Sequence, residues 1–101
     1  MAYRALEKLI NLHDGYRGAF RTTRGEVLLL QDEGEAYLLA RHCPHQEALL
    51  DAAPCANGVI TCPRHELAFS MRDGHCVNGN CGSLRVYPIA YEGNTLGVDE
   101  D

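Results

Sequence analysis

The run His42-Cys43-Pro44-His45 is followed by the run Cys62-Pro63-Arg64-His65, with sixteen residues between His45 and Cys62. Each run therefore offers one thiolate and one imidazole, in the order C-x-H and then C-x-x-H. The proline beside each cysteine fixes φ and removes a backbone donor, which helps to hold a loop open around a metal. Two such loops, each leaving the end of a strand, can face each other and supply four ligands to one site. A single C-x-H is weak evidence for a metal, whereas two matched runs are strong evidence.

Around these runs the pattern predicts short β-strands separated by turns, with little helix. Only residues 5–12 could form a helical turn or two. The turns Asp32-Glu33-Gly34, Arg72-Asp73-Gly74 and Glu92-Gly93-Asn94 place Gly or Asn where φ is often positive. Strands are expected at 3–6, 16–22, 26–31, 36–41, 58–61, 68–71, 84–91 and 95–98. Because Pro88 stands inside the alternating segment 84–91, we expect an edge strand there. The expected fold is an all-β antiparallel sandwich or barrel.

Composition and charge exclude several classes of protein. The chain has 101 residues, 46% of them hydrophobic and 23% charged, which is typical of one soluble globular domain. No apolar run approaches the roughly 18 residues that cross a bilayer, and no signal-peptide pattern opens the chain, so we expect no membrane contact and a cytoplasmic location. The net charge of −5 argues against a nucleic-acid partner, which needs a basic face.

Taken together, these residues resemble a Rieske-type [2Fe–2S] protein, whose ligand pattern is C-P-H-x16-C-P-x-H. The resemblance extends outward to the segment 26–41 before the first loop, and to Phe69, Arg72-Asp73-Gly74 and Leu84-Arg85-Val86-Tyr87-Pro88 after the second. It implies one domain over residues 1–101, with a small cluster-binding subdomain formed by loops at about 41–51 and 61–70. Among Rieske proteins, the chain is most similar to the small ferredoxins of bacterial aromatic-ring-hydroxylating oxygenase systems.

Carried over by residue, the resemblance implies that Cys43 and Cys62 hold one iron of a single [2Fe–2S] cluster. His45 and His65 would hold the other iron. Thiolates suit iron–sulfur clusters, and neutral imidazole suits iron. The implied function is electron transfer, not catalysis: a monomeric carrier that passes single electrons from a flavoprotein ferredoxin reductase to a terminal oxygenase, with an aromatic substrate expected.

The residues around the ligands predict a low reduction potential for a Rieske protein. Replacing two thiolates by neutral imidazoles places the family at about −150 to +300 mV. High-potential members carry two bridging cysteines at the positions of Ala48 and Arg64, and hydroxyl donors at the positions of Leu67 and Phe69. This chain has none of the four. Glu47 and Glu66, which stand where the family usually has glycine, add negative charge near the ligands.

Alternative interpretations remain open from the sequence. One is a carrier or small subunit of another redox system, such as a nitrite-reductase-like enzyme. A second is a Cys₂His₂ zinc-binding interaction module without a redox role. A third is a redox sensor that uses the spare cysteines. Cys55, Cys76 and Cys81 are expected to be thiols, although Cys76 and Cys81 could meet across the turn between them. His13, His42 and His75 are expected to be surface residues, and Phe69 a core residue.

Overall fold

The structure, a computed structural model, describes residues 2–23, 25–43, 49–62, 67–79 and 83–100. Within these ranges the chain forms short strands and one 3-10 helix, which confirms the all-β expectation. The elements are β1 (Ala2–Lys8), η1 (Leu9–Asn11), β2 (Arg17–Thr22), β3 (Gly25–Asp32), β4 (Glu35–Ala40), β5 (Cys55–Ala56), β6 (Val59–Thr61), β7 (Ala68–Ser70), β8 (Ala90–Glu92) and β9 (Thr95–Glu100). None of the helical residues in these ranges forms a segment long and apolar enough to span a membrane.

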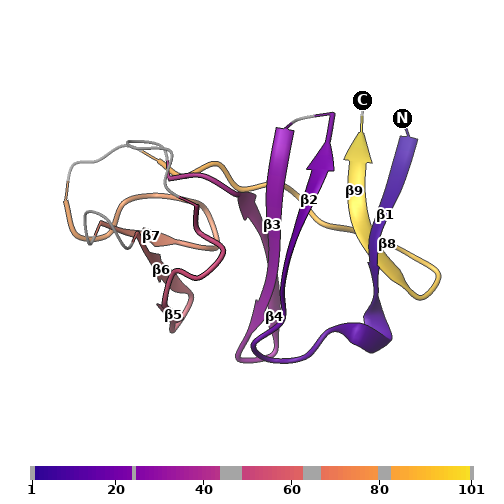
Figure 1. Cartoon of the computed structure of the whole chain (residues 1–101), viewed down its shortest axis with the longest axis horizontal. Coiled ribbons are helices and arrows are strands. Elements are labelled where there is room, and N and C mark those ends of the chain that lie inside the picture. The colour runs from indigo at the N-terminus through magenta and orange to yellow at the C-terminus, as the bar shows by residue number, and fades with distance from the viewer. Residues whose placement is uncertain (1, 24, 44–48, 63–66, 80–82, 101) are drawn as a thin grey trace.

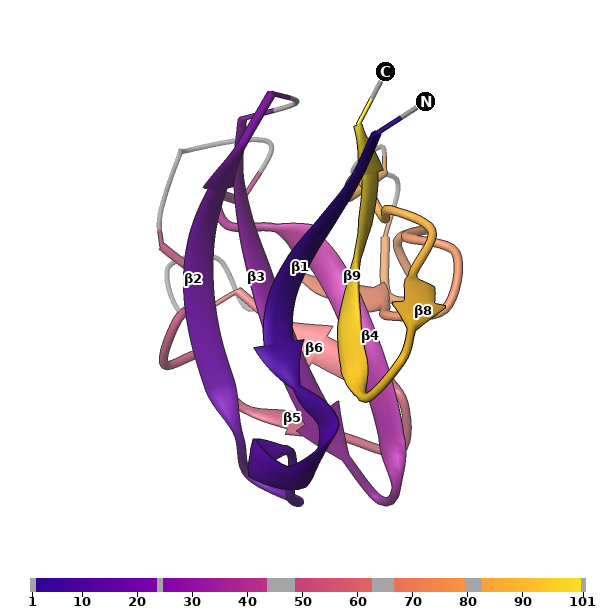
Figure 2. The ribbon, with the colours of Figure 1, turned by 90° about the vertical axis from the view of Figure 1, so that its right-hand side faces the viewer.

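The strands make three antiparallel sheets of three strands each, in the orders β1-β9-β8, β2-β3-β4 and β5-β6-β7. In Figure 1 the three sheets follow one another along the long axis, with β2-β3-β4 in the middle. Figure 2, turned by 90°, shows the two termini side by side at the free ends of β1 and β9. This agrees with the register, in which Ala2 pairs with Glu100.

The middle sheet has a core on each of its faces. From β3, Leu28 and Leu30 belong to a core with Ile60 and Phe69 of the small sheet β5-β6-β7. The alternate residues Val27 and Leu29 belong to a second core, formed with β9. All four β3 side chains are at most 1% exposed. A strand covered on both faces reads as a continuous apolar run instead of an alternating one, which explains the Val-Leu-Leu-Leu sequence.

The late segment 84–91 differs from the expected edge strand. Only Ala90–Glu92 is a strand (β8), and it pairs with β9. The residues before it run along the edge of β4, where Val86 makes a single bridge with Leu39 and the Tyr87 N–H donates to the Leu38 carbonyl. Pro88 has no N–H, so the ladder cannot continue through it. The segment passes from one core to the other: Leu84 packs in the core shared with β5-β6-β7, and Tyr87 packs in the core shared with β9.

Two smaller expectations also need correction. Residues 5–8 lie in β1 instead of a helix, and only Leu9–Asn11 forms a short 3-10 turn. Their pairing with β9 overrides a weak helical pattern, since tertiary contacts dominate propensity at this length. The two-residue strand β5 was not expected, because it is too short to give a pattern of its own.

Candidate metal centre

Cys43 and Cys62 are buried side chains at the ends of two backbone segments that leave the sheets. Cys43 is the third residue after β4, and its side chain is 1% exposed. Cys62 directly follows β6, and its side chain is 0% exposed. Both carry thiols, and both belong to the core shared by the middle sheet and the small sheet. The fold thus brings together two cysteines that lie nineteen positions apart in the sequence.

Backbone hydrogen bonds close the base of the first loop. His42 and Leu49 form an antiparallel bridge, and the Leu50 N–H donates to the Arg41 carbonyl at 2.8 Å. The residues between Cys43 and Leu49 therefore leave and re-enter the fold at neighbouring points. His42 is half-exposed, with its Nε2 3.7 Å from the Glu26 carboxylate, which agrees with the expected surface position.

The second loop is closed in the same way, at its own base. The Cys62 N–H donates to the Leu67 carbonyl at 2.8 Å, next to the pairing of Thr61 with Ala68. The Ala68 N–H in turn donates to the side-chain oxygen of Asn78 at 2.9 Å. Both cysteines thus stand just inside these backbone contacts, and the prediction that the two loops face each other around one site stays a prediction.

Charged side chains gather beside the first loop. Arg41 forms a two-pronged ion pair with Asp51, with Nε 3.0 Å from Oδ1 and Nη2 2.8 Å from Oδ2. Its remaining nitrogen, Nη1, lies 3.3 Å from the Glu26 carboxylate. The hydrogen bond from Arg41 holds the pKa of Asp51 below its usual value, and the hydrogen bond to Asp51 raises the pKa of Arg41. Both groups therefore stay charged throughout the ordinary pH range.

Arg17 of β2 also reaches this loop. Its Nη1 donates to the carbonyl oxygens of Leu50 (3.3 Å) and Asp51 (3.0 Å), and its Nη2 contacts the Cys55 sulfur at 3.2 Å. The sequence analysis did not single out Arg17, Arg41, Asp51 or Glu26. No sequence signal links them, because the pairs are separated by 10 to 34 positions and meet only through the folding of β2, β3 and β4.

The described residues fit the sulfur half of the expected cluster site. Thiolates are the usual ligands of iron–sulfur clusters. Cys43 and Cys62 are buried away from water, as suits cysteines that bind a cluster. His45 and His65 lie outside the described residues, as do Glu47 and Glu66. Within the described ranges, no three His, Cys, Asp or Glu side chains come together as a metal site.

The spare cysteines behave differently from one another. Cys55 carries a thiol, as expected, whereas Cys76 takes part in a disulfide bond, so the expectation of a thiol is wrong there. Near Cys76, the structure pairs His75 with Ser83 in an isolated bridge. Cys81 lies outside the described residues.

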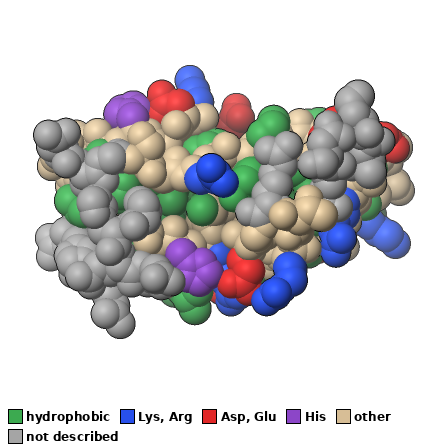
Figure 3. All heavy atoms as spheres, turned by 90° about the horizontal axis from the view of Figure 1, so that it is seen from above, with side chains coloured by type: hydrophobic (Ala, Val, Ile, Leu, Met, Phe, Trp, Pro, Cys, Tyr) green, Lys and Arg blue, Asp and Glu red, His purple; other side chains and the backbone are tan. Residues whose placement is uncertain are grey.

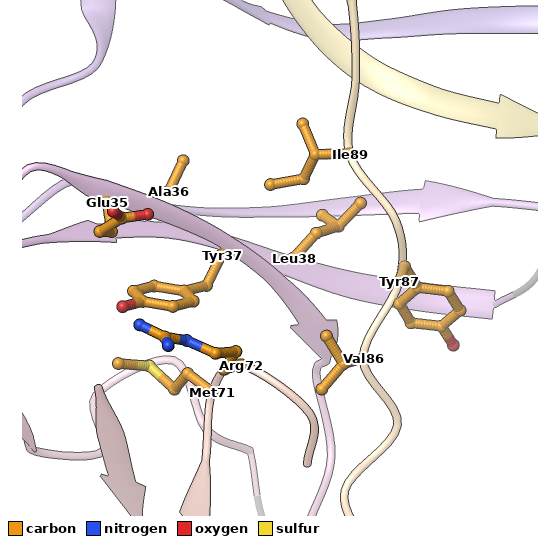
Figure 4. A pocket seen from close by; sticks show the side chains of 9 residues that line it. All are labelled: Glu35, Ala36, Tyr37, Leu38, Met71, Arg72, Val86, Tyr87 and Ile89. Atoms are coloured by element: carbon orange, nitrogen blue, oxygen red, sulfur yellow. The ribbon is translucent and has the colours of Figure 1, made fainter.

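Two cavities lie away from the cysteines. The first, of about 210 Å³, lies between β4 and the segment 86–89, and Figure 4 shows the Arg72 side chain between Tyr37 and Met71. It is smaller than the roughly 300–1,000 Å³ of typical ligand pockets. The second, of about 410 Å³, also borders Tyr37 and Arg72, and its one imidazole, His75, is held by Asp73 at 2.6 Å. Neither cavity includes Cys43 or Cys62.

One face of the molecule is shown from above in Figure 3. Hydrophobic side chains reach the surface along its middle, and acidic, basic and histidine side chains lie mainly along its two long sides. The charges of both signs are mixed, so the described residues of this face offer no continuous basic surface of the kind that phosphate backbones need.

Comparison with known proteins places these loops in a family. The family model of the Rieske [2Fe-2S] domain matches residues 5–88. The ferredoxin component of the alkene monooxygenase system of Xanthobacter autotrophicus is 33% identical over 87 residues, which is 85% of this chain and 71% of that protein. The chain therefore belongs to the Rieske [2Fe–2S] family, which implies one [2Fe–2S] cluster.

Solved structures agree over the full length. The ferredoxin of carbazole 1,9a-dioxygenase from Nocardioides aromaticivorans IC177 superposes with a TM-score of 0.85 at 26% identity, and all of each chain is covered. A ferredoxin from Sphingomonas yanoikuyae B1 has a TM-score of 0.86 at 20% identity, covering 99% of this chain and 100% of that one. The chain thus has the fold of a stand-alone Rieske ferredoxin, and its class is that of electron-transfer proteins instead of enzymes.

Proposed function

We propose that this chain is the ferredoxin of an oxygenase system, a carrier that accepts single electrons from a flavoprotein reductase and delivers them to a terminal oxygenase. The observation that carries the proposal is the likeness to two ferredoxins of oxygenase systems, at 33% identity over 85% of the chain and at 26% identity over all of it. One of them belongs to an alkene monooxygenase and the other to a carbazole dioxygenase. An aromatic substrate stays a prediction, because the substrate is bound by the oxygenase.

In this proposal Cys43 and Cys62 hold one iron, His45 and His65 hold the other, and residues 1–101 act as one Rieske domain. When bound, the cluster takes up and releases one electron. The chain keeps the thiolate side of the site dry, since Cys43 and Cys62 are fully buried. We also propose a cytoplasmic location, as expected from the sequence; the Cys76 disulfide would then be an exception to the usual reduced state of cysteines in that compartment.

The experiment that tests this function is reconstitution with a flavoprotein ferredoxin reductase and a terminal oxygenase from the same organism. NADH-dependent bleaching of the visible absorbance should occur on adding the reductase, and reoxidation should follow on adding the oxygenase and its substrate. Product should form at a rate proportional to the amount of this protein. A reduced protein that the oxygenase does not reoxidise would exclude the proposed role while leaving the family unaffected.

The reduction potential gives a sharper prediction. Leu67 has no hydroxyl, and its carbonyl accepts the Cys62 N–H, so a serine at position 67 would bring a donor close to a ligand sulfur. We expect Leu67→Ser to raise the potential by about 50 mV relative to Leu67→Ala, the equivalent of about 1 kcal/mol of preferential stabilisation of the reduced state. Voltammetry of the wild type should give a value near the low end of the Rieske range. A wild-type value in the upper half of that range would contradict the argument.

Partner docking can be tested with an exposed apolar residue of the first loop. Leu49 is half-exposed where the loop re-enters the fold, and Ile10 is an exposed apolar residue of η1, beside β1. We expect Leu49→Asp to slow electron transfer to the oxygenase about tenfold, the effect of losing one interface contact worth about 1.4 kcal/mol. Ile10→Asp is the matched control and should leave the rate unchanged. Equal rates for both variants, with unaltered visible spectra, would place the docking surface elsewhere.

A further inference from the structure

The first loop is closed by side chains as well as by its backbone. Arg41 and Asp51 are the first and last residues of the predicted loop 41–51, and the two side chains join through both carboxylate oxygens. A planar guanidinium matched to a carboxylate in this way fixes orientation as well as distance. The contact therefore holds the start of the loop to its end, and Arg41 lies two residues before Cys43.

Two further contacts anchor this pair to the middle sheet. Glu26 of β3 accepts from the third nitrogen of Arg41, and Arg17 of β2 donates to the Leu50 and Asp51 carbonyls. Every strand of the sheet contributes, since Arg41 itself follows β4. We call the four side chains Arg17, Glu26, Arg41 and Asp51 the clasp.

The clasp differs from an ordinary surface ion pair. The Arg41 and Asp51 side chains are only 25% and 38% exposed. Arg41 has two carboxylate partners, Asp51 and Glu26, and Arg17 donates to the backbone carbonyl of Asp51. Isolated exposed pairs contribute little, but a two-pronged pair within a network is the exception. The second loop is closed differently: its described closing contacts are backbone pairing and the neutral side chain of Asn78.

We propose that the clasp positions the first cluster loop, and that Arg41 and Asp51 thereby set the orientation of Cys43 toward the cluster. They are positioning residues, because they act through the backbone that carries Cys43. The inference rests on the proposed ligation by Cys43. It assigns a role to Arg41 and Asp51, which are not part of the family ligand pattern C-P-H-x16-C-P-x-H.

The test compares three variants of the cluster-loaded protein. Arg41→Gln removes the charge and the fork, and Arg41→Lys keeps the charge but loses the fork. Arg21→Gln is the matched control, since Arg21 lies 3.6 Å from the same Glu26 carboxylate yet is 82% exposed and is not one of the clasp residues. Three readouts are measured: amide hydrogen exchange of peptides that span residues 41–51, iron release to a chelator, and the EPR spectrum of the dithionite-reduced protein.

We expect Arg41→Gln to speed exchange in residues 41–51 but not in β3, to release iron about fivefold faster, and to shift or broaden the EPR lines. A fivefold faster release corresponds to an activation free energy that is lower by about 1 kcal/mol. Arg41→Lys should fall between Arg41→Gln and the wild type, and Arg21→Gln should match the wild type. If Arg41→Gln does not load a cluster, Asp51→Asn, which keeps a neutral acceptor, takes its place.

Unchanged EPR lines together with faster iron release would show a merely stabilising ion pair and overturn the proposal. Equal effects of Arg21→Gln and Arg41→Gln would also overturn it, since only overall charge would then matter. Failure of the ligand assignment is read separately, from iron retention in a Cys43 variant. Exchange of residues 41–51 is compared between variants of equal iron content, so that a change reports the contact between Arg41 and Asp51 and not loss of the cluster.

Discussion

Replacing Cys62 by serine is expected to remove the cluster, leaving nearly no iron in a protein that otherwise carries about two irons per chain. Cys62 is fully buried and opens the second loop, so no neighbouring water or flexible side chain can take its place. The serine hydroxyl is a hard, neutral donor that replaces a soft thiolate poorly. Cys43→Ser should give the same loss for the same reason, and so should His45→Ala and His65→Ala. The measurements are iron and sulfide content and the visible spectrum.

The chain offers a matched control in Cys55. It also carries a thiol, it is half-buried, and its sulfur contacts Arg17, but it lies outside the predicted ligand runs. Cys55→Ser should therefore keep the full iron content and an unchanged spectrum. If Cys43→Ser or Cys62→Ser retained iron as well as Cys55→Ser does, the ligand assignment would be wrong. A colourless wild type that contains zinc would instead favour the Cys₂His₂ alternative.

Replacing Gly74 by alanine is expected to give the largest loss of stability of any single methyl addition considered. Gly74 has φ +85°, and an added Cβ would overlap the carbonyl oxygen of Leu84. Backbone cannot yield as a flexible side chain does, and Gly74 also accepts the Leu84 N–H at 2.7 Å. The positive φ and the overlap together should cost about 3 kcal/mol or more, or about 12 °C in apparent Tm.

Gly34 separates the two contributions. It has φ +80° in the β3–β4 turn, and an added Cβ would meet nothing within 4 Å. Gly34→Ala should therefore show the conformational cost alone, about 1 kcal/mol. Thermal unfolding followed by far-UV circular dichroism compares the two variants. Equal losses in Gly34→Ala and Gly74→Ala would mean that the contact between Gly74 and the Leu84 carbonyl is not close.

Much of the fold was predictable because the turns are marked by their residues. Gly34 adopts positive φ between β3 and β4, as the Asp-Glu-Gly sequence indicates; Glu33 also adopts positive φ, which the sequence did not predict. The segment 84–91 was not predictable in detail. Its alternation is real, but whether an extended segment becomes a strand depends on the partner beside it, and here β4 offers one bridge at Val86 before Pro88 intervenes.

The site divides in a similar way. The sequence singles out Cys43 and Cys62 as candidate ligands because ligand chemistry needs particular residue types at fixed spacing. The structure places both in one buried core, and their ligation stays a prediction. The clasp was not predictable, since an arginine that pairs with an aspartate ten positions away has no local signature. The disulfide at Cys76 was not predictable either, because cysteine pairing depends on which thiols the fold brings within bonding distance.

The two-faced middle sheet has a consequence for the speed of electron exchange. Leu28 and Leu30 pack in the same core as Cys43 and Cys62, and the opposite face of β3 is fixed by a second core. Such close-packed interiors are stiff. We therefore expect the atoms behind the cysteines to shift little when charge arrives or leaves, and this side of the site to contribute little to the reorganisation energy. Electrons can then pass quickly between partners whose potentials differ only slightly.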